Sequence, residues 1–136
     1  MVSRTDASGS YTALYRPYHL IGLELGISVA SVGVRGEPTG APTGWRADAA
    51  AVAKRPLAAG EVLDGEGGFS VYGRLMPADD SRRVGALPIG LARGVRLTRA
   101  VGADQAVTWD DVAVDESDDA VRVRREMERE FGGPNR

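Results

Sequence analysis

Two stretches of the chain, AKRPLAAGEVL (residues 53–63) and LTRAVGADQAV (residues 97–107), align with each other over their whole length. Each has a basic residue near its start, a turn-forming residue at Gly60 or Asp104, and an apolar residue at its end. Each copy is predicted to form a strand, a tight turn and a return to the core. The repeat therefore predicts a small, pseudo-symmetric, mainly β domain whose two halves face each other.

The composition around this repeat suits one globular domain. Of the 136 residues, 43% are hydrophobic and 26% are charged, and the formal net charge is −2. A chain of this charge has no general attraction to nucleic acid or to anionic lipid, so we expect neither nucleic acid nor a membrane as partner. The absence of cysteine and the single histidine, His19, exclude thiolate and multi-histidine metal sites, and we expect no metal. The polar N-terminus lacks the apolar run of a signal peptide, which favours a cytoplasmic protein.

Composition divides the chain into five predicted segments. Residues 1–15 are polar and are expected to be flexible, and residues 16–35 form an apolar helical segment. Residues 36–45 are a Gly/Pro linker. The β domain is expected over residues 46–118, where short apolar stretches alternate with turn residues. Residues 119–136 are predicted to form a short amphipathic helix and a loose tail.

The apolar segment LIGLELGISVASV (residues 20–32) is predicted to belong to a helix from Pro17 to Val34. Apolar residues fall almost all round this helix, and Gly22 and Gly26 would let another backbone approach closely. A helix of this kind needs cover on several sides, either from the rest of this chain or from a second chain. We therefore expect residues 17–34 to contact a second copy of the chain or a partner subunit.

The C-terminal helix is predicted over Asp119–Phe131, with an apolar stripe and two ion pairs spaced four residues apart. The stripe consists of Ala120, Val123, Met127 and Phe131, and the pairs are Arg122 with Glu126 and Arg124 with Glu128.

The two repeat copies, extended to AKRPLAAGEVLDGEGG (residues 53–68) and LTRAVGADQAVTWDDV (residues 97–112), resemble the paired R-x-φ-x-x-G-E-x-φ elements of SAF domains. In the second copy, Asp104 and Gln105 replace the usual Gly-Glu, and aspartate tolerates the left-handed turn conformation better than most residues. The resemblance implies the antifreeze-like β-clip fold, here with an N-terminal apolar helix and a short C-terminal amphipathic helix.

A wider resemblance includes residues 14–32, 35–44 and 71–99. These stretches look like the C-terminal SAF region of homoserine-dehydrogenase-like NAD(P)-dependent oxidoreductases. Such enzymes carry a Rossmann domain, whereas this chain has no G-x-G-x-x-G motif after a strand. We therefore expect no cofactor and no binding of NAD(H) or NADP(H). The resemblance implies either a free-standing relative or one piece of a split enzyme.

Four polar residues surround the start of the apolar helix: Arg16, Tyr18, His19 and Glu24. His19, Glu24 and Tyr18 are candidates for proton transfer, and Arg16 is a candidate for binding an acid. The alternative is that His19 is a helix-start or interface residue.

Arg74 is a second candidate for ligand binding. It lies between Gly73 and Leu75 and precedes a predicted loop from Pro77 to Ser81, and Arg74 and Ser81 together would hold a carboxylate ligand beneath this loop. The alternative is a surface arginine in a β-turn. The acidic run of residues 110–119 lacks the pattern of a calcium loop and is predicted to be a solvated face that caps the last helix.

Three functions remain open from the sequence. The first is a free-standing SAF-domain protein that encloses a small polar ligand, such as a hydroxy acid or sugar acid, and assembles as an oligomer or accessory subunit. The second is a small cofactor-independent lyase, dehydratase or isomerase of a hydroxy acid. The third is the small subunit of a split oxidoreductase.

Overall fold

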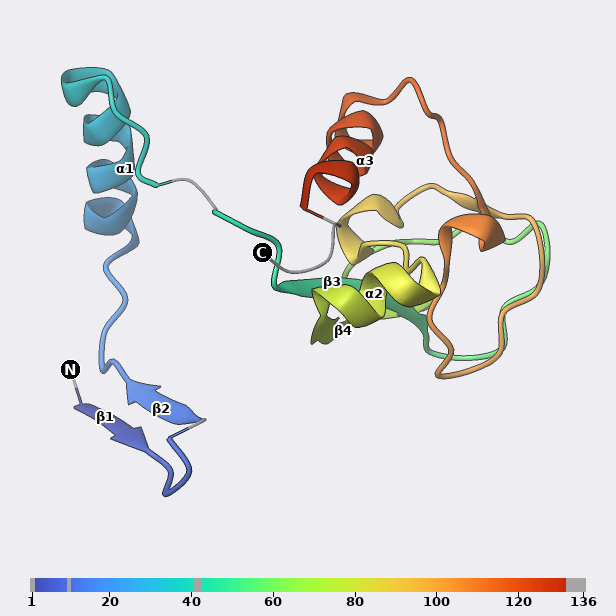
Figure 1. The fold of residues 1–136 in the computed structure, drawn as a ribbon, viewed down its shortest axis with the longest axis horizontal. Coiled ribbons are helices and arrows are strands. Elements are labelled where there is room, and N and C mark those ends of the chain that lie inside the picture. The colour runs from blue at the N-terminus through green and yellow to red at the C-terminus, as the bar shows by residue number, and fades with distance from the viewer. Residues whose placement is uncertain (1, 10, 41–42, 132–136) are drawn as a thin grey trace. The chain divides into compact units, whose positions relative to one another are not determined.

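The computed structural model describes residues 2–9, 11–40 and 43–131, which belong to two compact units, Met1–Pro42 and Thr43–Arg136 (Figure 1). The predicted tail after Gly132 lies outside the described residues. In chain order the elements are β1 (Val2–Thr5), β2 (Thr12–Tyr15), α1 (Ile21–Arg35), β3 (Ala47–Ala53), β4 (Val71–Pro77), α2 (Ala78–Val84), the 3-10 turn η1 (Ile89–Leu91), β5 (Arg96–Leu97), the 3-10 turn η2 (Trp109–Asp111), β6 (Val112–Ala113) and α3 (Asp119–Phe131).

The first unit contains a β-hairpin that was not predicted. β1 and β2 pair antiparallel within the segment expected to be flexible. The Asp6 carboxylate organises the connection, since it accepts hydrogen bonds from the backbone N–H groups of Ser8 (3.2 Å) and Tyr11 (3.0 Å). An aspartate that bonds to the backbone a few residues further along favours such a turn.

Helix α1 starts later than predicted, at Ile21 and not at Pro17, because the carbonyl of Leu20 accepts the first helical bonds. It ends at Gly36, whose φ of 65° is the left-handed conformation that glycine adopts readily. No residue of α1 is buried.

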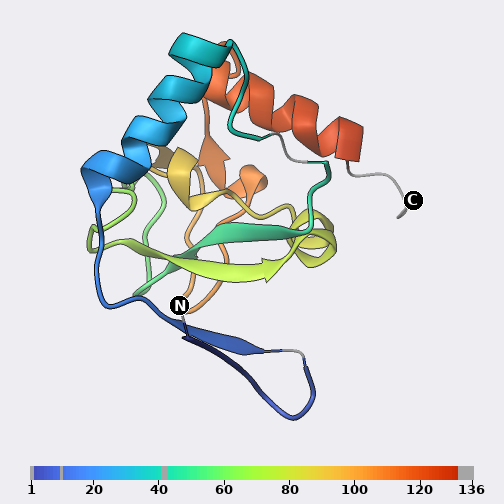
Figure 2. The same cartoon turned by 90° about the vertical axis from the view of Figure 1, so that its left-hand side faces the viewer.

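The second unit is organised around β3, a strand of small residues. β4 pairs antiparallel along one side of β3 (Figure 2), and on its other side Val52 forms a bridge with Ala106. Residues 50–53 of β3 are completely buried. The hydrophobic core consists of Ala51, Ala53, Leu57, Leu63, Val71, Leu87, Ala92, Leu97, Val101, Val107, Trp109, Val112 and Val121.

The two repeat copies face each other as the sequence predicts. Leu57 and Val101 occupy equivalent places and exchange both backbone hydrogen bonds, at 2.8 and 3.0 Å. The turn residues are also equivalent: Gly60 has φ 84° and Asp104 has φ 59°, and among the described residues Asp104 is the one non-glycine residue with positive φ. The aspartate in the second copy therefore adopts the left-handed conformation that the family pattern assigns to glycine.

Further hydrogen bonds repeat the symmetry pair by pair. In one half Gly60 N–H donates to Leu97 and in the other Asp104 N–H donates to Ala53, both at 2.8 Å. The side chains of Glu61 and Gln105 each accept from the backbone N–H three residues earlier, both at 3.1 Å. The fold of this unit is thus a duplicated β-clip.

Three details of the prediction need correction. The chain is only partly β, since helices hold more of the described residues than strands, and much of the β pairing consists of isolated bridges. The segment after Pro77 is helix α2 and not a loop, with acidic residues in its first turn and arginines in its last, as the helix dipole favours. Helix α3 has the predicted bounds, but it buries Val121, and Val123 is exposed.

Candidate functional site

The structure brings together the four candidate residues at the start of α1. The Glu24 carboxylate lies between two cations or potential cations: Arg16 Nη2 is 2.5 Å from its Oε1, and His19 Nδ1 is 3.1 Å from its Oε2. The Arg16 guanidinium also lies over the Tyr18 ring, 5.3 Å from its centre. The sequence spacing alone did not show that His19 and Glu24 meet.

These four residues, the Glu24 cluster, are of the types found in proton-transfer sites, but some of their side chains are well exposed to solvent. An imidazole beside a carboxylate can take and return a proton, and a guanidinium can hold an acidic substrate. The side chain of His19 is 71% exposed and that of Arg16 is 46% exposed. The Glu24 side chain is 32% exposed, and its Oε1, which contacts Arg16, is itself buried.

The second candidate, Arg74, lies on β4 beside Tyr72. Their cross-strand partners are Ala50 and Val52, and cross-strand partners share a face of the sheet. Arg74 Nη2 donates to the backbone carbonyl of Asp104 at 2.7 Å, and the Tyr72 hydroxyl lies 3.4 Å from Asp104 Oδ1. Arg74 and Tyr72 thus meet at the left-handed turn of the second repeat copy.

Arg74 differs from the arginines of the repeat itself. Arg55 pairs with Glu61, and its equivalent Arg99 pairs with Asp111. Arg74 has no carboxylate partner among the described residues, and its described hydrogen bond goes to a neutral carbonyl. An exposed guanidinium that forms no ion pair can bind a carboxylate with its remaining N–H groups.

Ser81 is not part of this site. Its residue is 1% exposed, and its hydroxyl donates to Asp48 Oδ2 at 2.5 Å. A buried hydroxyl that is already bonded to a carboxylate is not available to a ligand from solvent. Helix formation after Pro77 accounts for this, because it turns Ser81 towards β3.

The polar network around Asp48 was not predicted from the sequence. Arg124 of α3 donates to both oxygens of Asp48, at 3.1 and 2.6 Å, and to Glu128 at 2.8 Å. Its guanidinium also lies 4.6 Å from the centre of the Trp45 ring. Burial raises the pKa of Asp48, but the hydrogen bonds from Arg124 and Ser81 outweigh burial and hold that pKa below its usual value. This network attaches α3 to the β domain.

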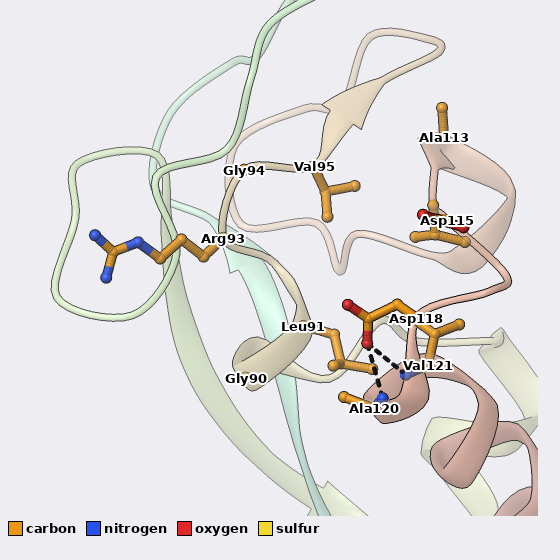
Figure 3. A pocket seen from close by; sticks show the side chains of 11 residues that line it. Gly90, Leu91, Arg93, Gly94, Val95, Ala113, Asp115, Asp118, Ala120 and Val121 are labelled. Atoms are coloured by element: carbon orange, nitrogen blue, oxygen red, sulfur yellow. Dashed lines mark hydrogen bonds between the residues drawn. The ribbon is translucent and has the colours of Figure 1, made fainter.

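A shallow hollow of about 400 Å³ lies between the turn of residues 90–95 and the start of α3 (Figure 3). One oxygen of each aspartate in its lining is already bonded: Asp118 Oδ1 accepts from the N–H of Ala120 at 2.7 Å, and Asp115 Oδ1 accepts from the hydroxyl of Ser117 at 2.6 Å. Figure 3 shows the Arg93 side chain extending away from the hollow. None of the candidate residues of the sequence lines it.

In the part of the chain that the structure describes, His, Asp and Glu side chains form no group of three or more that could hold a metal ion. No described helix has both the length and the apolar character needed to cross a membrane.

Comparison with known families identifies the central part of the chain. Residues 48–113 match the family model of the SAF domain. No curated protein matches the chain. The chain therefore contains a SAF domain, and the matched residues extend from β3 to β6 and include both repeat copies together with Tyr72, Arg74 and Asp104.

Proposed function

We propose that the protein is a ligand-binding or accessory SAF-domain protein, and that Arg74 and Tyr72 bind the carboxylate of a small hydroxy acid or sugar acid. The observation that carries this proposal is the state of Arg74. Its guanidinium is exposed, it is held in place by the Asp104 carbonyl, and it lacks a carboxylate partner among the described residues.

The neighbouring groups suit a hydroxylated acid. A guanidinium held at one N–H can offer the others to a carboxylate, and the phenolic hydroxyl of Tyr72 can donate to or accept from a ligand hydroxyl. The turn carbonyls of both repeat copies are bonded to arginines, since Arg96 Nη1 donates to the Gly60 carbonyl at 2.6 Å. Arg96 is thus the structural counterpart of Arg74 in the other half. Tyr72 stands two residues before Arg74, whereas Gly94 stands two residues before Arg96.

Thermal shift with lactate, malate and gluconate tests the proposal. A ligand at 100 times its dissociation constant stabilises the folded state by about 2.7 kcal/mol. We expect at least one of these acids to raise the melting temperature, and Arg74→Met to abolish the rise. Arg96→Met is the matched control, because it removes the same kind of contact to a turn carbonyl. Equal loss in both variants, or no shift with any acid, would contradict the proposal.

The exposed helix α1 supports the assembly part of the proposal. Its apolar side chains are 61–69% exposed at Ile21, Leu23, Leu25, Ile27, Val29 and Val32. Burying one such side chain contributes roughly 1.5–3 kcal/mol, so a helix with this surface gains from a partner. The partner is a second copy, or a separate subunit such as the nucleotide-binding part of a split oxidoreductase.

Gly26→Leu tests this assembly. No atom lies within 4 Å of a Cβ added at Gly26 or at Gly44, so leucine fits both positions within one chain. We expect Gly26→Leu to weaken self-association, measured by light scattering, or capture of a co-expressed subunit. Gly44→Leu is the control and is expected to have no effect. A monomer at high concentration with no co-purifying subunit would contradict the assembly.

A second candidate function is catalysis at the Glu24 cluster, as a cofactor-independent lyase, dehydratase or isomerase of a hydroxy acid. The contact between His19 and Glu24 favours it. Its test is turnover of a hydroxy-acid panel by the unchanged chain, by Glu24→Gln and by the control Glu37→Gln. No turnover, or equal turnover in all three, would eliminate it.

A further inference from the structure

The loop of residues 64–70 holds an aromatic side chain out in solvent. Phe69 is 86% exposed, which makes it the most exposed large apolar side chain among the described residues. The Asp64 carboxylate fixes the loop, because it accepts hydrogen bonds from the N–H of Phe69 and from the N–H and hydroxyl of Ser70. A Cβ on Gly68 would lie 2.2 Å from Asp64 Cγ, so this bonding requires glycine there. Phe69 therefore projects from a loop whose conformation is fixed by local hydrogen bonds.

Two cations lie beside this loop. Lys54 Nζ donates to the carbonyl of Gly68, the residue before Phe69, at 2.5 Å. Arg93 runs along the start of the loop, since a Cβ on Gly65 would lie 2.7 Å from Arg93 Cβ. Among the described residues, neither cation forms an ion pair with a carboxylate. An aromatic ring with cations around it fits an apolar hollow that has carboxylates at its rim.

The hollow at the start of α3 has this composition. Its volume is about 400 Å³, and Leu91, Val95 and Val121 are part of its lining (Figure 3). Asp115 and Asp118 also line it, and the described hydrogen bonds of both carboxylates use Oδ1 and leave Oδ2. Neither carboxylate has a cationic partner among the described residues. The hollow therefore offers apolar contacts and uncompensated negative charge together.

The loop and the hollow are neighbours in one copy. Leu63, which directly precedes the loop, donates to the Val95 carbonyl at 2.8 Å and accepts from the Gly94 N–H at 2.9 Å. The turn of residues 93–95 therefore borders both features. Phe69 nevertheless does not line the hollow of its own copy. Two copies related by a two-fold axis beside this turn can each present a ring to the hollow of the other.

We propose that two copies of the chain associate in this way, with Phe69 of each copy in the hollow of the other. Well-packed aromatic anchors of this kind dominate the energy of an interface. Lys54 then lies beside Asp115 and Asp118 of the second copy, so the charges around the ring and the hollow are complementary. A second copy is the partner because the chain itself carries both halves of the contact. The contact lies in the second unit and is separate from the assembly through α1, so neither proposal rests on the other.

Sedimentation velocity tests this contact in the Gly26→Leu background, which weakens assembly through α1. Phe69→Ala removes the ring and should weaken the dimer about tenfold or more. Its control is Leu75→Ala, because Leu75 is also exposed (77%) but lies at the far end of β4 from the loop. Gly90→Leu obstructs the hollow, which Gly90 lines, and no atom lies within 4 Å of a Cβ added there. It should weaken the dimer as Phe69→Ala does, whereas the control Gly44→Leu should not.

Mixing the two variants gives a result that loss of folding cannot produce. The Phe69→Ala chain keeps its hollow and the Gly90→Leu chain keeps its ring, so a mixed dimer retains one of the two contacts. We expect the mixture to associate more strongly than either variant alone. No gain on mixing, an unchanged dimer in Phe69→Ala, or a monomer at every concentration before either change is made would overturn the inference.

Fluorine NMR supplies a readout in which both halves of the contact are kept. Incorporated para-fluorophenylalanine labels Phe69 and Phe131, the two phenylalanines of the chain, and Phe69→Ala assigns the signals. The Phe69 signal is expected to shift as the protein concentration rises, because the ring leaves solvent for the hollow, while the Phe131 signal stays in place. A Phe69 signal that is independent of concentration would show that the ring stays in solvent and that the inference is wrong.

Discussion

Arg124→Met should strongly destabilise the second unit, because it leaves the Asp48 carboxylate buried without its counter-charge. The side chains of Asp48 and Arg124 are 6% and 13% exposed, and two hydrogen bonds join them. Removing one partner of a buried pair costs about 3–5 kcal/mol. Methionine also removes the guanidinium that lies over the Trp45 ring, so the loss includes this cation–aromatic contact. For a domain of this size, the expected fall in melting temperature exceeds roughly 10 °C.

Urea unfolding at neutral pH measures this loss directly. Arg122→Met is the matched control on the same helix, because the described ion pair of Arg122 is with Asp119 at the surface, where the two side chains are 59% and 89% exposed. We expect its effect to stay within about 0.5 kcal/mol. The double change Asp48→Asn with Arg124→Met should recover part of the loss, since neither charge is then left alone. Equal free energies of unfolding for Arg124→Met and Arg122→Met would refute the reasoning.

Three further predictions follow from local geometry and from the motif analysis. Hydrogen bonds from the Ser70 hydroxyl and from the Phe69 and Ser70 N–H groups lower the pKa of Asp64 from 3.8 to about 2, so the folded state loses this stabilisation as the pH falls through that range. Asp64→Asn should therefore remove this part of the pH dependence of the unfolding free energy, and an unchanged acid-unfolding curve would contradict this. Gly60→Ala should cost about 1–2 kcal/mol in urea unfolding, and Asp104→Gly should be neutral or stabilising, because both positions are left-handed; the opposite order would be inconsistent with the turn geometry. Calorimetry with NADH and NADPH should show no micromolar binding, since the phosphate-binding glycine turn is missing.

The features that the sequence predicts best are those that repeat. Gly60 and Asp104 could be recognised as equivalent turns because the surrounding residues align, and their φ angles agree with that alignment. The hairpin at the N-terminus and helix α2 were missed because each depends on a few short-range bonds within polar residues, which periodicity does not reveal. Asp6 in the first case is an ordinary surface aspartate until its bonds to the backbone are known.

The buried face of α3 shows a second reason for a wrong prediction. The sequence of α3 predicts an apolar stripe that includes Val123. The helix packs instead through Val121 and the polar side chains of Arg124 and Glu128. The partner of Arg124, Asp48, is far away in the chain. Ser81 was misjudged for the same reason, since it is the pairing with Asp48 that buries it. Contacts between distant polar residues leave no periodic pattern in one sequence.

The duplicated halves also explain why a ligand site is expected at one turn and not at the other. In the first half Arg55 is neutralised by Glu61, the residue that also accepts from the turn backbone. In the second half Gln105 keeps the backbone hydrogen bond but carries no charge. The second turn carries its negative charge on Asp104, whose Oδ1 lies 3.4 Å from the Tyr72 hydroxyl and whose backbone carbonyl accepts from Arg74. In the first turn the carboxylate and the arginine pair with each other, whereas in the second the described bond of Arg74 goes to a carbonyl, and this difference lies where the second copy departs from the pattern of the first.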